Sequence, residues 1–514
     1  MMLAEAKNNP QPKILDLESL AQALKPLRAL GRRIVLAHGV FDLLHVGHIR
    51  HLREARAMGD VLVVTLTEDK HVNKGPNRPA FAEALRAEAL AALSDVDYVA
   101  ISRFPTAIEV IRALRPNVYV KGPDYKRQDQ DITGMIAAEE SAIREVGGII
   151  AITEDETFSS SALLNRHFST YPAPTEAYLR TFREQWSADD VMAFMDRLSS
   201  LRVVVVGEAI LDEYVYVDQM GKSAKDPVLA MRYDRTETYA GGSLAIANHL
   251  SSFCKSVELV TYLGEHETQE AFVRSALRPG VRANFIMKRN SPTIVKRRYV
   301  EATLRNKLFE VYRFNDIPMT NGDEEELCAL LEARIPAADA IVCADFGHGF
   351  LGRAAKTLLS NCGRFLAVNT QINAANVRFH AISSYERADY VCINEGELRL
   401  DARDRSAPLD LLVNGLSQKL QCSRFLVTRG ADGVEYHDNG VCHAAPAFAR
   451  TIVDRVGAGD AVLGVTALAA VAKIPPEVIP FIANVIGAQK VSAMGNSVVI
   501  ERIPTLKFVQ ALLK

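Results

Sequence analysis

HGVFDLLHVGHIRHL, residues 38–52, is the stretch of sequence that decides the fold of the N-terminal part of the chain. It follows the β-branched run 34–37 and leads into residues 48–58, where apolar residues recur at helical spacing. Backbone amides and the positive end of a helix dipole attract phosphate at such a junction, and Gly47 permits close approach of the chain. The segment therefore predicts a strand, a phosphate-binding loop and a helix.

The same alternation of short β-branched runs and amphipathic helical stretches continues to about residue 166 and resumes at residue 203. This rhythm predicts parallel sheets covered on both faces by helices. We therefore expect an α/β protein with two α/β domains, the first of them Rossmann-like. The predicted strands are 34–37, 61–66, 98–101, 118–120 and 149–152 in the first domain, and 203–206, 341–344, 365–368, 390–393 and 425–428 in the second.

The length of 514 residues also favours two domains, because a single core rarely grows that large. Between them, prolines and the only tryptophan, Trp186, interrupt the rhythm. Ser187, followed by Ala-Asp-Asp, predicts the N-cap of a helix that ends near Ser200. The expected boundaries are an N-terminal extension at 1–30, a first domain at 31–167, a helical linker at 168–200 and a second domain at 201–514.

Composition and charge exclude several classes of protein. Hydrophobic residues make up 48% and charged residues 24%, the balance of a soluble globular protein. A net charge of −2 gives no electrostatic reason to expect nucleic acid or a membrane as a partner. Seven cysteines without a CxxC pair indicate reduced core thiols, with metal binding as the weaker alternative. The N-terminus lacks the apolar core of a signal peptide, and the longest apolar stretch, 461–472, is too short to span a bilayer, so we expect a cytoplasmic protein.

The two histidines of the opening segment, His45 and His48, can donate hydrogen bonds to phosphoryl oxygens, where charge accumulates during substitution at phosphorus. Histidines near a turn can also merely satisfy local hydrogen bonds, but the position between strand and helix favours the phosphate clamp. The segment resembles the cytidylyltransferase-like nucleotidyltransferases. That resemblance implies transfer of a nucleotidyl group from a nucleoside triphosphate to a phosphate monoester, with Mg²⁺ bridging the phosphates.

Three further segments, TEDKHVNKGPNRP, VKGPDY and TFSSSALL, match this family in order. A lysine run is usually a solvated face, and serines before a helix are usually caps. Their joint occurrence at the carboxyl ends of strands, where open α/β sheets bind ligands, favours a binding site. The resemblance places His45, His48 and Lys70 in catalysis; Lys74 and Tyr125 lie in the same matching segments. It places in nucleotide binding Val40, Phe41, Asp42, Gly47, Arg78, Lys121, Gly122, Asp124, Ser159, Ser160 and Ser161.

The second informative segment is DRVGAGDAV, residues 454–462, which sets Gly457, Ala458 and Gly459 before Asp460 and an apolar helical run. Small residues leave amides exposed at a helix N-terminus as an anion hole, and Asp460 stands where it can take a proton from a sugar hydroxyl. A glycine turn with an acidic cap is the alternative interpretation. The segment predicts phosphoryl transfer.

From about 200 to 514 the chain resembles the ribokinase family, through VVVVGEAILDEY, GGSLAIAN, PTIVKRR, ADFGHG, NEGE and TRGADG. The resemblance implies a ribokinase-like sheet with a small lid, and a carbohydrate kinase that uses ATP. It implies sugar contacts from Asp212, Gly241, Gly242, Lys296, Arg298 and Asp460, with Thr293, Asp345 and Gly347 in neighbouring motifs. It implies nucleotide or anion contacts from Asn394, Glu397, Thr428, Gly430, Gly433, Gly457, Ala458, Gly459 and Asn484. No side-chain cluster is expected to bind metal directly; Mg²⁺ is expected on the phosphates, with Glu397 acting through water.

Four residues depart from the pattern of the heptose kinases in this family: Ala245, His348, Asn369 and Val456. The polar or cationic groups usual at these places are missing. The anion hole and the base remain, so an active kinase is favoured, with its sugar left open.

Together the two halves resemble the bifunctional heptose kinase/adenylyltransferases of ADP-heptose synthesis, with the domain order inverted. The resemblance implies phosphorylation of a heptose 7-phosphate at O1, then nucleotidyl transfer from ATP to a sugar 1-phosphate. A CTP-dependent transferase for a polyol or other sugar phosphate remains open, as does a kinase-like domain that acts on another sugar or serves as a sensing or assembly module. Because ribokinase-like domains often pair through the lid, we expect a homo-oligomer, a dimer through the kinase domain. The anomer and channelling are undetermined.

Overall fold

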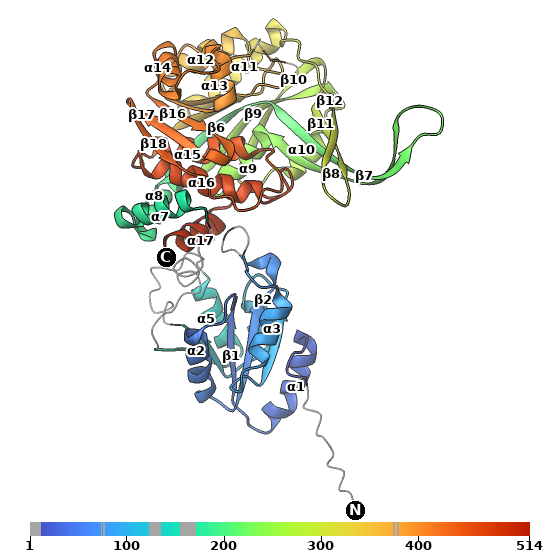
Figure 1. Ribbon diagram of the computed structural model, residues 1–514, viewed down its shortest axis with the longest axis vertical. Coiled ribbons are helices and arrows are strands. Elements are labelled where there is room, and N and C mark those ends of the chain that lie inside the picture. The colour runs from blue at the N-terminus through green and yellow to red at the C-terminus, as the bar shows by residue number, and fades with distance from the viewer. Residues whose placement is uncertain are drawn as a thin grey trace, which may run out of the picture. The chain divides into compact units, whose positions relative to one another are not determined.

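The computed structural model describes residues 12–72, 75, 78–122, 135–154, 171–373, 376–377 and 380–514. The chain divides into two compact units, Met1–Thr170 with Leu506–Lys514, and Tyr171–Thr505 (Figure 1). Both units are built on sheets covered by helices, so the α/β class predicted from the sequence is confirmed. Among the described residues, no helix is long and apolar enough to cross a membrane.

A five-stranded parallel sheet in the order β3-β2-β1-β4-β5 forms the centre of the first unit. The order reverses between β1 and β4, so the connections that leave these two neighbours run in opposite directions. Such a reversal leaves a crevice at the carboxyl ends of the strands, where α/β sheets bind ligands. All five predicted strands are present. Their bounds are β1 (Ile34–Gly39), β2 (Val61–Thr67), β3 (Tyr98–Ser102), β4 (Val118–Lys121) and β5 (Ile149–Ile152).

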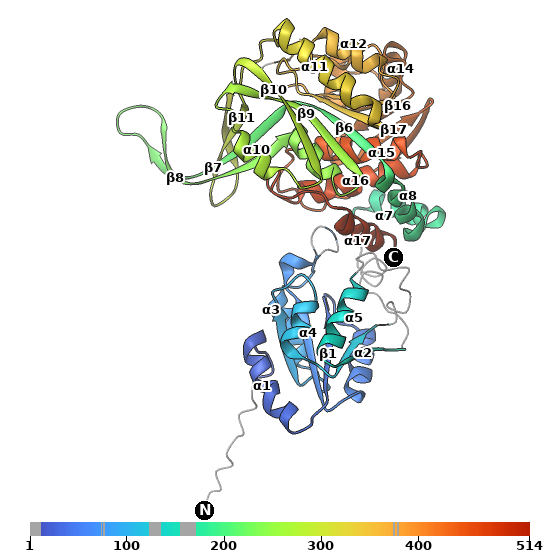
Figure 2. The same cartoon turned by 180° about the vertical axis from the view of Figure 1, so that it is seen from behind.

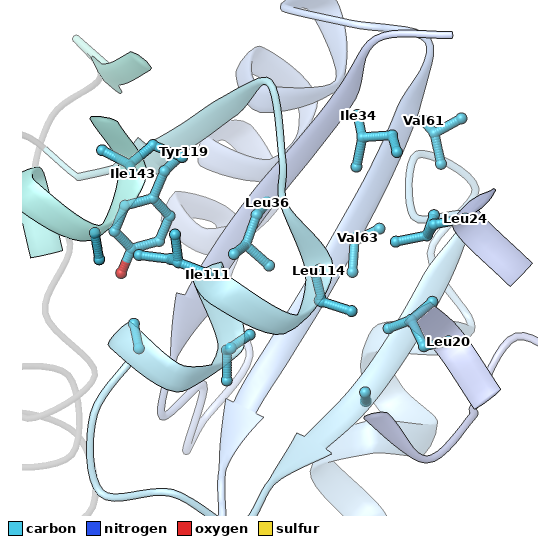
Figure 3. Packing of buried hydrophobic residues seen from close by; sticks show 14 residues of the cluster. Leu20, Leu24, Ile34, Leu36, Val61, Val63, Ile111, Leu114, Tyr119 and Ile143 are labelled. Carbon is cyan, nitrogen blue, oxygen red and sulfur yellow. The ribbon is translucent and has the colours of Figure 1, made fainter. Parts of the chain in front are cut away.

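Side chains alternate between the two faces of this sheet, and each face has its own apolar core. Leu36 and Val63 point into one core, while Val35 and Val64 point into the other. Figure 3 shows the first core, which the sheet shares with three helices. These three are α1 (Leu17–Ala29), α4 (Ile108–Leu114) and α5 (Ile136–Glu145); the opposite face carries α2 (Val46–Ala57) and α3 (Glu83–Ala91).

Helix α1 lies in the predicted N-terminal extension, residues 1–30. Asp16 caps it by accepting a hydrogen bond from the Ser19 amide. Leu20 and Leu24 are fully buried against the sheet (Figure 3). The extension therefore supplies part of the core. Pro26 inside the helix concealed its helical pattern.

The second unit contains a nine-stranded sheet in the order β10-β9-β6-β13-β14-β15-β16-β17-β18. It is parallel except for the last three strands, which pair antiparallel. The five strands predicted here are all present. The bounds are β6 (Arg202–Gly207), β9 (Ser256–His266), β10 (Val281–Pro292), β13 (Ala340–Asp345), β14 (Phe365–Thr370), β15 (Tyr390–Asn394), β16 (Arg424–Thr428), β17 (Val434–Asp438) and β18 (Val441–Ala445).

Helices cover both faces of this sheet (Figures 1 and 2). One face carries α11 (Asn321–Arg334), α12 (Arg353–Asn361), α13 (Glu395–Ala402) and α14 (Leu409–Leu420). The other face carries α9 (Ser243–Leu250), α15 (Ala458–Val471) and α16 (Val478–Val491). Helix α10 (Glu270–Ala276) also belongs to this unit, whereas α17 (Arg502–Leu513) begins in it and ends in the segment that groups with the first unit. Helices α15 and α16 are buried almost all round, which explains their continuously apolar sequence.

A separate four-stranded sheet, the lid sheet, has the order β12-β11-β7-β8. Its strands are β7 (Ala209–Lys222), β8 (Leu229–Gly242), β11 (Ile294–Glu301) and β12 (Lys307–Arg313). The far end of the β7–β8 hairpin projects away from the body of the second unit (Figures 1 and 2).

The segment before β6 contains two helices, α7 (Ala173–Gln185) and α8 (Ala188–Asp196), and groups with the second unit. Ser187 caps α8 in a capping box with Asp190, as the sequence predicts. The ring of Phe182 stacks on Phe481, with centroids 4.3 Å apart. Most of the segment interpreted as a linker thus packs on the second unit.

We expect Leu24→Ala to lower the free energy of unfolding of the first unit by about 2–5 kcal/mol, because it leaves a cavity against the sheet. Urea denaturation of the full chain measures the change. Leu30→Ala serves as the matched control, since Leu30 is 76% exposed and its truncation creates no cavity. Equal effects of the two substitutions would show that α1 adds nothing to this core.

Candidate functional sites

The two histidines of the first unit lie side by side at the start of α2. His45 is the N-cap residue, and its Nδ1 accepts a hydrogen bond from the Gly47 amide at 3.1 Å. His48 is in the first turn, and its ring stacks on His45 with centroids 3.9 Å apart. Both imidazoles therefore occupy the positive end of the helix dipole, the arrangement that a phosphate clamp requires.

The residues between β1 and α2 are held by buried cations. Phe41 has a positive φ of 48° and contacts His48 edge to face. Asp42 is buried and forms an ion pair with Arg78, with Nε 3.1 Å from Oδ2. The Val40 carbonyl accepts a hydrogen bond from the buried Arg86. Asp42 and Arg78, both predicted to bind nucleotide, are thus joined to each other and shape the loop.

The two predicted lysines of this site differ in setting. Lys70 is largely exposed and pairs with Glu68 at 2.7 Å. Lys121, at the end of β4, is buried and pairs with Glu139 at 2.7 Å. Gly122 follows it in open space, where an added Cβ would meet nothing within 4 Å. Asp124 and Ser159, Ser160 and Ser161, with Lys74 and Tyr125, lie outside the described residues.

Two further histidines, to which the sequence assigns no role, lie near Lys121 of β4. Burial lowers the pKa of His38 to about 3, with Lys121 adding to the effect, and its Nδ1 lies 2.9 Å from the Thr65 hydroxyl. Burial and then Lys121 also lower the pKa of His51, whose Nδ1 lies 2.8 Å from the Thr153 hydroxyl. These rings stay neutral at physiological pH. Both lie in the quoted opening segment, so the signal was present, but their position beside β4 depends on the sheet.

In the second unit, a cavity of about 500 Å³ collects many of the predicted nucleotide residues. Its walls are largely apolar, with Phe448, Ile452 and Val491 among them, which suits a nucleobase. The predicted residues that line it are Thr428, Gly430, Gly433, Ala458, Gly459 and Asn484.

One end of this cavity is the N-terminus of α15. Gly457 precedes the helix with a φ of +76°, and a Cβ there would lie 2.4 Å from Asn496 Oδ1. Only glycine meets both constraints. An added Cβ at Gly459 would meet nothing within 4 Å, so a ligand has room to approach the main chain at this residue.

Asp460, in the first turn of α15, is 7% exposed. Burial raises its pKa to about 7, and the nearby carboxylate of Asp212 adds to the rise. Lys490 and Lys296 act in the opposite direction. A carboxyl group with this pKa can accept a proton near neutral pH.

The predicted sugar-binding residues surround Asp212 on β7. Its carboxylate accepts hydrogen bonds from Arg298 at 2.6 Å and from Asn496 at 3.0 Å. Gly241 has to be glycine, because a Cβ would lie 2.2 Å from Asp212 Oδ2. Lys296 is the register partner of Asp212 on β11, and burial lowers its pKa. Gly242, with φ +58°, leads into α9.

A second cavity, of about 330 Å³, adjoins this group through Asn496. Tyr239, Ala240, Ala245 and Phe272 are among its lining residues. The small side chain at Ala245, one of the departures from the family pattern, leaves space there.

Other predicted residues do not line either of these two cavities. Asn394 and Glu397 form the capping box of α13. Burial raises the pKa of Glu397. Thr293 donates to the Thr268 carbonyl, and Asp345 is held by Lys356 at 2.9 Å and by Tyr385 at 3.0 Å, so both have structural partners.

The other residues that depart from the family pattern also make contacts within the fold. The Asn369 side chain donates to the Cys392 carbonyl at 2.7 Å. His348 is buried, and its ring packs on Phe314 with centroids 4.7 Å apart. The Val456 carbonyl accepts a hydrogen bond from Lys490 Nζ at 2.9 Å, so this buried lysine, which the sequence did not single out, braces the turn before the anion hole.

Comparison with known proteins agrees with this architecture. A family model described as pfkB family carbohydrate kinase matches residues 200–502, more than half of the chain. The chain belongs to the pfkB carbohydrate kinase family. In this pfkB family member, residues 36–166 match the cytidylyltransferase-like model, so the transferase-like region precedes the kinase region, as predicted.

Two curated relatives are the bifunctional proteins HldE of Helicobacter pylori and Geotalea uraniireducens. The first is 40% identical over 161 residues, covering 31% of this chain and 32% of the relative. The second is 45% identical over 125 residues, covering 24% and 26%. The matched stretches thus span a third or less of these relatives' length.

Among solved structures, a mutant of phosphofructokinase-2 from Escherichia coli aligns with a TM-score of 0.50 at 16% identity. The alignment covers 61% of this chain and all of the other. The likeness concerns the fold, and it confirms the ribokinase-like sheet predicted for the second unit.

The raised pKa of Asp460 predicts a pH effect on the stability of this pfkB unit. In the unfolded chain an aspartate titrates near ~3.9. The folded unit therefore binds more protons between pH ~4 and ~7, and it loses stability as pH rises through that range. We expect Asp460→Asn to remove this loss, so that the variant gains stability relative to the parent chain between pH 5.5 and 8. Urea denaturation at both pH values measures it.

Asp226→Asn is the control, since Asp226 is exposed. If Asp460→Asn and the parent chain lost equal stability over this pH range, the buried carboxyl would not be titrating as inferred.

Proposed function

We propose that this protein is a bifunctional enzyme that makes a nucleotide-activated sugar. The pfkB unit phosphorylates a sugar with ATP, preferentially a heptose 7-phosphate at O1. The N-terminal unit transfers a nucleotidyl group from ATP to the resulting type of sugar 1-phosphate, giving a product such as ADP-heptose. The observation that carries the proposal is the convergence of the anion-hole turn, buried Asp460 and the Asp212 group beside a nucleotide-sized cavity.

In the kinase unit, Asp460 takes the proton of the sugar hydroxyl as that oxygen attacks the γ-phosphorus of ATP. The bond from this phosphorus to the β-bridging oxygen breaks, and ADP leaves. Amides at the start of α15, opened by Gly457 and Gly459, stabilise the charge on the transferring group. The carboxylate of Asp212 can recognise a hydroxyl group of the sugar, while Lys296 and Arg298 offer positive charge for a phosphate on the sugar.

In the N-terminal unit, an oxygen of the sugar 1-phosphate attacks the α-phosphorus of the nucleoside triphosphate, and pyrophosphate leaves. The attacking oxygen is already anionic, so no base is needed. His45 and His48 donate hydrogen bonds to the phosphoryl oxygens at the positive end of α2. Catalysis consists of positioning and charge stabilisation.

Nucleoside triphosphates react as Mg²⁺ complexes, in which the ion neutralises phosphate charge. The Glu397 carboxylate can contact such an ion through a bound water molecule. Each of its carboxylate oxygens accepts one N–H among the described residues, from Ile372 and Asn394, and keeps lone pairs for a further partner.

The departures at Ala245, His348, Asn369 and Val456 support a second candidate. The Asn369 side chain and the Val456 carbonyl form hydrogen bonds within the fold. In this alternative, the pfkB unit therefore accepts a different sugar or acts as a sensing or assembly module. The transferase would then use CTP with a polyol or other sugar phosphate.

Mass spectrometry of products after incubation with ATP or CTP and a panel of sugar phosphates tests the proposal. We expect Asp460→Asn to lower the kinase rate by about 10²–10⁴-fold, the usual contribution of a general base, with nucleotidyl transfer unchanged. His48→Asn is the reciprocal variant and should lower nucleotidyl transfer alone. Equal kinase rates with and without the Asp460 carboxylate would support the non-catalytic alternative.

We further propose that two pfkB units pair through their lid sheets. The face of this sheet carries exposed apolar side chains, among them Leu229, Tyr233 and Phe309, each at least half exposed. They line a groove of about 960 Å³ between β7, β8, β11 and β12. Contiguous apolar surface of this kind marks a protein interface.

Phe309→Asp should convert a dimer into a monomer, because it replaces an exposed apolar side chain of that face with a charged one. Sedimentation velocity measures the change. Val441→Asp, at an exposed site on β18 outside the lid, should leave the dimer intact. A parent chain that sediments as a monomer of 56.5 kDa would contradict the pairing.

A further inference from the structure

Four side chains of types that bind metals lie close together at the edge of the nine-stranded sheet. Neither proposed activity uses these residues. Asp410, Glu435, His437 and Cys442 each offer one ligand atom, and these atoms all lie within 4.8 Å of one another. None of the four lines the nucleotide cavity.

The hairpin of β17 and β18 explains why these side chains meet. His437 and Cys442 are direct partners across the antiparallel pair. Glu435 lies two residues before His437 on β17, so the two side chains share one face of the sheet. Asp410, in the first turn of α14, approaches that same face, with Oδ1 3.6 Å from His437 Nδ1.

His437 is the decisive residue of the group. It is only 5% exposed, and its Nε2 has no hydrogen-bond partner within the described part of the chain. That nitrogen lies 3.4 Å from Glu435 Oε2, too poorly placed to form a hydrogen bond there. A buried imidazole between two carboxylates and a thiol is a polar group that lacks a partner, and a cation placed among them would supply one.

We propose that these four residues form a binding site for a transition metal of the Zn²⁺ class. One imidazole, one thiolate and two carboxylates match the ligand types and the number of a closed tetrahedral zinc site. Ligand atoms of such a site are about 3.5 Å apart, so the four side chains have to close by about 1 Å. Asp410 and Cys442 are exposed and have room to make this movement.

The site is separate from the Mg²⁺ of phosphoryl transfer, because Mg²⁺ prefers six oxygen ligands and rejects thiolate. Glu435 can act as a metal ligand without losing its hydrogen bond with Arg429. Its Oε1 accepts a hydrogen bond from Arg429 at 2.7 Å, which leaves Oε2 for the metal. The proposed role is to fasten the edge hairpin to α14.

Titration of the full-length chain with Co²⁺ in excess Mg²⁺ tests the site, since a thiolate ligand gives Co²⁺ a charge-transfer absorption band. We expect one equivalent of Co²⁺ to bind with this band, Zn²⁺ to displace it, and Zn²⁺ to raise the Tm. Cys442→Ser should abolish the band and weaken binding by at least about tenfold, the lower range for disturbing a metal site. Asp410→Asn, also at an exposed position, should weaken binding and keep the band.

Matched controls lie on the same hairpin and elsewhere in the unit. His443→Gln alters the next residue of β18, whose side chain points to the opposite face, and Cys362→Ser removes another thiol. Both variants should bind as the parent chain does. The absence of a charge-transfer band in the parent chain, or its persistence in Cys442→Ser, would overturn the proposal and leave the four residues as a polar cluster that binds no metal.

Discussion

Phosphate groups concentrate negative charge, and both units offer main-chain amides at the start of a helix to meet it. In the first unit the helix is α2, capped by His45; in the second it is α15, which begins after Gly457. The amides of a first helical turn have no partner inside the helix, so they remain available to an anion. In the proposed function, the other groups of each site orient the substrate around these amides or balance its charge.

The kinase unit places two carboxylates, Asp212 and Asp460, close enough for the first to raise the pKa of the second. Buried like charges are unfavourable unless cations surround them. Arg298 binds Asp212 directly, while Lys490 and Lys296 lower the pKa of Asp460. The result is a carboxylate base whose pKa lies near neutral pH. This pKa favours proton transfer but lowers the stability of the folded unit.

The local sequence was sufficient to predict the strands, because buried parallel strands consist of short runs rich in β-branched residues. It was also sufficient for the Ser187 capping box and for the position of His45 at a helix start, since both depend on neighbours within four residues. It failed for α1, where Pro26 broke the expected pattern. It did not indicate that Asp42 and Arg78, both predicted to bind nucleotide, form an ion pair with each other.

The sequence by itself determined the two α/β units and the two glycine-containing turns that begin α2 and α15. Only the tertiary structure decided which side chains meet. Asp212 binds Arg298 and Asn496, which are 86 and 284 residues away. The cluster around His437 likewise depends on the register of one hairpin and on where α14 begins. The physical reason is that hydrophobic periodicity and capping act over a few residues, whereas strand order and register set contacts between segments that are distant in the chain.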